Sequence, residues 1–154
     1  MRDFRSSGFD PRLIIGQIAG MQALMYLGFG AWLMLFNGLA GRPATTIGLE
    51  HIFSAPTQSF SYPGGTVTLA AYFINALAGG CFLCVIVERA KKCLDFTVTS
   101  YLLHLCGCAW YESFPDRWEW WAVTIANVVA MSLLGEYLCM RREMQEIPLF
   151  QSGR

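Results

Sequence analysis

Charged residues are scarce in this chain. Asp, Glu, Lys and Arg make up 14% of the residues, whereas a soluble domain usually carries about 25%. The eleven basic and eleven acidic residues cancel, and a formal net charge of zero argues against nucleic acid as a partner. Hydrophobic residues reach 55% and are gathered into long blocks, which favours membrane spans over a water-facing fold.

Motifs for catalysis and phosphate binding are missing as well. The sequence has no Gly-rich phosphate loop and no nucleophile with a plausible base, so we expect neither enzyme activity nor a cofactor. Two cysteine pairs lie at opposite depths of the predicted helices, so we expect no bound metal. These pairs are Cys81 with Cys84 and Cys106 with Cys108. For Cys93 and Cys139, which adjoin the membrane surface, palmitoylation is a hypothesis from composition alone.

Four apolar blocks follow one another, at residues 13–36, 66–87, 96–111 and 118–140. At a rise of ~1.5 Å per residue, the first, second and fourth clear a hydrocarbon core of ~30 Å, while the third reaches only ~24 Å. The first block is longer than the ~7–15 apolar residues of a signal peptide, so we interpret it as a retained span. The sequence therefore predicts an all-α polytopic membrane protein, a single domain of four transmembrane helices.

The basic residues are divided unequally between the two sides of such a bundle. Nine of the eleven lie in the terminal segments and the 88–95 loop: Arg2, Arg5, Arg12, Arg89, Lys91, Lys92, Arg141, Arg142 and Arg154. Only Arg42 and Arg117 lie in the other two loops. Because cytosolic segments carry the excess of Lys and Arg, we expect both termini in the cytosol. Residues 37–65 then form a luminal loop, and residues 141–154 a cytosolic tail.

Each predicted span carries one hydrogen-bonding side chain near its middle: Gln22, Asn75, His104 and Asn127. Polar groups at that depth are either interhelical hydrogen-bonding groups or part of a proton or substrate path. Three of the four are uncharged amides, which do not relay charge by titration. We therefore favour interhelical hydrogen bonds.

Charged side chains near the membrane surface have separate expectations. Glu136 lies about one helical turn from the cytosolic surface, and we expect Lys91 or Lys92 to pair with it. Asp95 is placed to cap the start of the third span. His51 stands alone in the luminal loop, and we interpret it as solvated.

Small residues follow one ridge of the first span, including the pair Gly16-x-x-x-Gly20. This spacing lets two helix backbones approach closely. The motif alone does not separate packing within the bundle from pairing with a second copy, so homo-oligomerisation stays open.

Four stretches resemble the Sys (Sys-one) family of small Golgi integral membrane proteins: "FDPRLIIGQI" at 9–18, "FINAL" at 73–77, "KKCLDFTVT" at 91–99 and "GEYLCMRREMQEIPL" at 135–149. The resemblance implies four spans with both termini cytosolic. It also implies a receptor that recruits an Arf-related small GTPase to Golgi membranes and supports traffic between endosomes and the trans-Golgi.

The two longest family-like stretches both face the cytosol in the expected topology. We hypothesise that they form the GTPase docking surface, together with an apolar tail anchor. For Arg141 and Arg142 the alternative role, as topology signals and contacts to the anionic lipid bilayer, stays open. The candidate residues are Lys91, Lys92, Asp95, Glu136, Arg141, Arg142, Ile147 and Leu149. The alternative is a small proton-coupled carrier that uses His104 and Glu136.

Overall fold

The structure, a computed structural model, describes residues 11–43 and 47–145. All regular secondary structure in these two ranges is helical. The all-α fold class predicted from the sequence is confirmed for this part of the chain.

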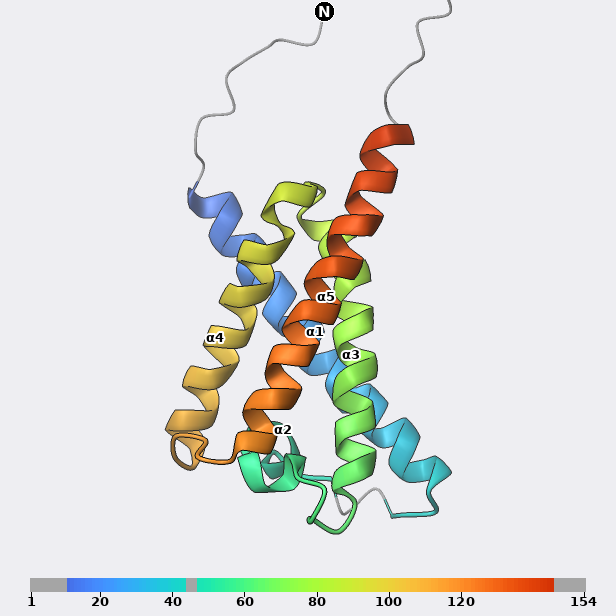
Figure 1. The fold of residues 1–154 in the computed structure, drawn as a ribbon, viewed down its shortest axis with the longest axis vertical. Coiled ribbons are helices and arrows are strands. Elements are labelled where there is room, and N and C mark those ends of the chain that lie inside the picture. The colour runs from blue at the N-terminus through green and yellow to red at the C-terminus, as the bar shows by residue number, and fades with distance from the viewer. Residues whose placement is uncertain (1–10, 44–46, 146–154) are drawn as a thin grey trace, which may run out of the picture.

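Four long helices form the bundle; three run roughly alongside one another, and the first crosses behind them obliquely (Figure 1). They are α1 (Pro11–Leu39), α3 (Gly65–Ile86), α4 (Cys93–Tyr111) and α5 (Trp118–Gln145). The start of α1, the α3–α4 turn and the end of α5 lie at one end, which we call the basic end. The α1–α3 and α4–α5 connections lie at the opposite end, the loop end. Helix α3 packs closely against both α1 and α5, whereas α4 contacts mainly α5.

Three helices of the described ranges are long and apolar enough to cross a membrane: α1, α3 and α5. Helix α4 is not among them, although its 19 residues reach ~28 Å. It is longer than the predicted 96–111 block because Cys93, Leu94 and Asp95 are also helical. The start of α1 and the end of α5 lie at the same end of the bundle. This arrangement is compatible with four membrane crossings, which we take up as a proposal below.

The core is a stripe of α1 packed on α3. Met21, Met25, Phe29 and Leu33 are buried at a four-residue spacing, which places them on one face of α1. Across this contact the Phe29 ring meets the Tyr72 ring edge-on, with centroids 5.4 Å apart. The pattern is that of a helix with one face in the bundle and the other toward lipid.

Helix α3 lies between α1 and α5 because glycine lets both approach. A Cβ at Gly79 would lie 2.8 Å from the sulfur atoms of Met25 and Met131, which belong to those two neighbours. Gly16 and Gly20 behave differently, since a Cβ at either position meets nothing within 4 Å. The Gly16-x-x-x-Gly20 pair therefore does not pack against the other helices that the structure describes.

The α1–α3 connection folds back under the bundle as the short helices α2 (Glu50–Phe53) and η2 (Ala55–Gln58). We call residues 50–59 the loop-end cap. The Ser54 hydroxyl donates to Glu112 Oε2 at 2.5 Å, and the Ser59 hydroxyl donates to Glu119 Oε2 at 2.6 Å. Both partners lie at the loop end of the α4–α5 hairpin. The sequence reading did not foresee this cap.

His51 is one correction that follows from the cap. Its side chain is only 12% exposed and packs edge-on against the Tyr62 ring, with centroids 6.3 Å apart. The Gly48 N–H donates to His51 Nδ1 at 3.4 Å. The expectation of a solvated histidine was wrong because the loop folds back on itself.

Candidate functional site

The surface at the basic end depends on a tight turn between α3 and α4. Glu88 adopts a positive φ of 57°, a backbone region that non-glycine residues rarely occupy, and the chain reverses there. The turn continues as η3 (Ala90–Lys92) directly into α4. A strained residue at this position needs support from its surroundings.

That support comes from the end of α5. The Ala90 N–H donates to Glu143 Oε1 at 3.1 Å. Arg142 Nη1 donates to the carbonyl of Cys84 at 3.2 Å, and Arg142 Nη2 lies 3.6 Å from Glu88 Oε1. Three contacts thus fasten the last turns of α5 to the end of α3 and to the turn. The sequence analysis did not predict the contacts of Glu88 and Glu143. The one indication was that both are acidic residues close to basic ones in the sequence.

Five of the candidate docking residues lie at this end of the bundle. Lys91, Lys92 and Asp95 are exposed on η3 and the first turn of α4, and Arg141 and Arg142 are exposed near the end of α5. Because the turn is fastened to α5, the two basic segments are held in one place. Two further candidates, Ile147 and Leu149, lie outside the described residues.

Glu136 and Asp95 do not have the partners expected for them. Glu136 is half-buried and makes no ion pair with Lys91 or Lys92 in the described structure. Asp95 is the third residue of α4 and not its N-cap, since the helix begins at Cys93 and the capping position is Lys92. A carboxylate in the first turn is still favourable there, because it complements the positive end of the helix dipole.

Two buried thiols meet beneath this surface. Cys93 at the start of α4 and Cys139 of α5 are both buried, with their sulfur atoms 3.5 Å apart. They mark the place where α4 and α5 come together at the basic end. In the described ranges, no three His, Cys, Asp or Glu residues are grouped so as to hold a metal ion.

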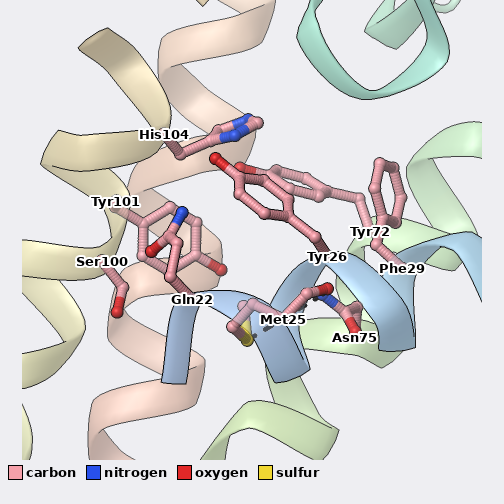
Figure 2. Close-up of a pocket in the computed structure, with 9 residues that line it drawn as sticks. All are labelled: Gln22, Met25, Tyr26, Phe29, Tyr72, Asn75, Ser100, Tyr101 and His104. Atoms are coloured by element: carbon pink, nitrogen blue, oxygen red, sulfur yellow. Dashed lines mark hydrogen bonds between the residues drawn. The ribbon is translucent and has the colours of Figure 1, made fainter. Parts of the chain in front are cut away.

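Three of the four mid-span polar residues line one interior cavity. Gln22, Asn75 and His104 come together there from α1, α3 and α4, as Figure 2 shows, whereas Asn127 does not line it. Asn75 Nδ2 donates to the Met25 carbonyl at 3.0 Å, joining α3 to α1. This is the interhelical hydrogen bond expected from the sequence, made by one of the four.

The other three polar side chains make no such link between the described helices. His104 Nε2 lies 3.5 Å from the Cys108 sulfur of its own helix. Gln22 Oε1 and both side-chain polar atoms of Asn127 are buried without a hydrogen-bond partner in the described structure. Such groups cost free energy in an apolar environment, so these residues contribute less to stability than Asn75.

The cavity itself is too small for a solute. Its volume is about 20 Å³, close to the minimum that holds one water molecule. The rings of Tyr26 and Tyr72 each lie 6.0 Å from the His104 ring, centroid to centroid, and their hydroxyls point toward it (Figure 2). Glu136 is not among the lining residues. The geometry therefore gives no support to a carrier that uses His104 together with Glu136.

The sequence matches one protein family and two of its members over nearly the whole chain. Residues 4–149 match SYS1, the family described as an integral membrane protein linking to the trans-Golgi network. The chain is 35% identical over 144 residues to a SYS1 homolog of Nematostella vectensis, covering 94% of this chain and 90% of that protein. It is 36% identical over 151 residues to a SYS1 homolog of Dictyostelium discoideum, covering 98% of this chain and 63% of that protein. No solved structure gives a significant match.

Proposed function

Because this chain belongs to the SYS1 family of integral membrane proteins linked to the trans-Golgi network, we propose that it is the membrane receptor for an Arf-related small GTPase. It would recruit the GTPase to Golgi membranes through its basic end and so support vesicle traffic between endosomes and the trans-Golgi. The proposal includes four membrane crossings, with both termini and the basic end in the cytosol.

One observation carries this proposal: the turn before α4 is fastened to the end of α5 at the basic end. Glu143 and Arg142 fasten the 88–92 turn to α5, and Lys91, Lys92 and Arg141 are each exposed at this end. A binding surface held in place loses less conformational entropy when a partner docks. Clustered positive charge also steers an acidic partner toward the membrane surface.

The length of α5 supports the same reading. Its 28 residues reach ~42 Å, whereas the 22 residues of α3 reach ~33 Å. The last turns of α5 extend past the other helices at the basic end (Figure 1). A partner in water therefore meets α5 first.

The test is GTPase recruitment to Golgi membranes in cells that lack the endogenous protein. Wild type should restore recruitment, whereas Lys91→Ala/Lys92→Ala and Arg141→Ala should reduce it, each about three- to tenfold, as expected for loss of exposed interface charges. Arg117→Ala, which removes an exposed basic residue at the loop end, is the matched control. Each variant must first be shown at the Golgi at wild-type abundance.

Two results would speak against the proposal. Normal recruitment in cells without the protein would sink the receptor function itself. Normal recruitment by all the basic-end variants, or an equal loss with Arg117→Ala, would keep the receptor but remove this docking surface.

A further inference from the structure

Three of the six cysteines meet at one place beneath the surface of the basic end. Cys93 of α4 and Cys139 of α5 have their sulfur atoms 3.5 Å apart. Cys84, two residues before the end of α3, has its side chain beside that of Cys139. Each thiol comes from a different helix, and none belongs to the docking surface proposed above.

The three thiols differ in how easily a reagent reaches them. Cys93 is 0% exposed and Cys139 is 1% exposed, so neither sulfur is open to its surroundings. This burial disfavours the palmitoylation considered from the sequence, because acylation needs an open thiol. Cys84, in contrast, is partly exposed. A small reagent at the membrane surface therefore meets Cys84 before the other two.

Contacts around the cluster hold the three helices together at this point. Arg142 Nη1 donates to the Cys84 carbonyl at 3.2 Å, which fastens the end of α3 to α5. Gly135 of α5 lets its neighbours approach, since a Cβ there would lie 2.8 Å from Leu83 Cδ1 and 3.6 Å from the Cys93 sulfur. The Cys93 and Cys139 sulfur atoms thus need only a small movement to reach the about 2 Å bond of a disulfide.

We propose that these three thiols form a peroxide-sensitive relay. Cys84 is the residue that hydrogen peroxide oxidises, and the oxidation passes inward through Cys139 to end as a disulfide between Cys93 and Cys139. The exposed thiol supplies access, and the buried pair supplies the stable product.

The relay has three steps, each of which balances. The Cys84 sulfur attacks one peroxide oxygen, the O–O bond breaks, and the departing hydroxide takes the thiol proton to form water, leaving a sulfenic acid. The Cys139 thiol attacks that sulfur and expels the hydroxyl as a second water, which joins Cys84 to Cys139. Cys93 then attacks the Cys139 sulfur, and its proton goes to the departing Cys84 thiol. Overall, two thiols and one peroxide give one disulfide and two water molecules.

The product ties the start of α4 to the last turns of α5, across 46 positions of the chain. Glutathione reverses the relay through the same exposed thiol. In the topology proposed above, the cluster lies on the cytosolic side, where disulfides are transient and often redox-sensing. The chemistry itself does not depend on GTPase docking and is tested without it.

The experiment treats the purified full chain in nanodiscs with hydrogen peroxide, stops the reaction by alkylation and maps the disulfides by mass spectrometry. Wild type should end with the Cys93–Cys139 disulfide. Cys84→Ser should slow its formation about tenfold or more, because the buried pair then meets peroxide only when the helices open locally. Cys81→Ser is the matched control, since it removes an exposed cysteine one turn earlier on α3, and should react like wild type.

Two further variants should stop the relay at its intermediates. Cys139→Ser should accumulate the sulfenic acid at Cys84, which dimedone captures as a stable adduct. Cys93→Ser should accumulate the disulfide between Cys84 and Cys139. Cys84→Ala replaces Cys84→Ser if that variant does not fold.

The proposal fails if the Cys93–Cys139 disulfide forms at the wild-type rate without Cys84. It also fails if dimedone labels Cys81 instead of Cys84, or if the product in wild type is a disulfide between Cys81 and Cys84.

Discussion

Two asparagines in the middle of the bundle meet different surroundings. Asn75 donates to the Met25 carbonyl of a neighbouring helix, whereas both polar atoms of the buried Asn127 side chain lack a partner in the described structure. A buried amide that forms a hydrogen bond stabilises the fold, whereas a buried amide without a partner destabilises it, because its desolvation is not compensated. The two residues look alike in sequence but should respond differently to substitution.

Asn75→Leu should therefore lower the free energy of unfolding by about 1 kcal/mol, in the range measured for hydrogen bonds between membrane helices. Asn127→Leu should be neutral or stabilising, because it removes two unpaired polar atoms and keeps a similar volume. Unfolding by SDS in mixed micelles measures both. Equal destabilisation by the two variants would contradict the different roles assigned to them.

Gly28 offers a second test at the scale of one atom. A Cβ at this position would lie 2.6 Å from Asn75 Oδ1, so Gly28→Ala should displace the amide and cost about 1–3 kcal/mol. Gly16→Ala on the same helix meets open space and should be neutral, or gain up to about 1 kcal/mol from helix propensity. Thermal unfolding in detergent separates the two. A stable Gly28→Ala protein would show that the α1–α3 contact is looser than described.

At the scale of whole helices, the contact of α4 with α5 at the basic end can be trapped chemically. With their sulfur atoms 3.5 Å apart, Cys93 and Cys139 need only a small movement to form a disulfide. A mild oxidant should crosslink the two helices, and dithiothreitol should reverse it. A protease site inserted in the α4–α5 connection makes the crosslink visible on a gel.

The two exposed cysteines supply the control for this experiment. Cys139→Ser should abolish the crosslink, whereas Cys106→Ser should leave it intact. If Cys81 and Cys106 react together at least as fast as Cys93 and Cys139, the helices are not arranged as described.

The helices were predictable because each is a long apolar block, and block length is a local property of the sequence. The first residue of α4 was harder to predict. Residues 93–95 are helical and follow a turn that Glu143, some fifty positions later in the chain, fastens in place, so Asp95 lies inside the helix instead of capping it. The loop-end cap was not predictable for the same reason. Its burial depends on Glu112 and Glu119, and nothing within residues 50–59 indicates those partners.

The whole molecule has two unlike ends, and their sides of the membrane can be tested directly. Among the described residues, Arg42 and Arg117 are the basic side chains at the loop end, and six others lie at the basic end: Arg12, Arg89, Lys91, Lys92, Arg141 and Arg142. The excess should keep the basic end in the cytosol. This asymmetry was readable from sequence, because it requires only the order of the blocks and the positions of the charges.

Glycosylation acceptors placed at the exposed turn around Phe60 and Ser61 should be modified in the secretory pathway, and acceptors at Lys91 and Lys92 should not. A gel shift that disappears on deglycosylation is the readout. Modification at residues 91–92 alone would reverse the orientation. Modification at both places would mean that the chain does not cross the membrane four times.

The loop-end cap cannot close until late in the synthesis of the chain. Ser54 is separated from Glu112 by 58 positions, and Ser59 from Glu119 by 60. At ribosomal speeds of about 5–20 residues per second, the serines are synthesised about 3–12 seconds before their carboxylate partners. During that interval residues 50–59 can bind chaperones or be clipped by proteases. The cap therefore closes only after the α4–α5 connection, which carries Glu112 and Glu119, has been synthesised.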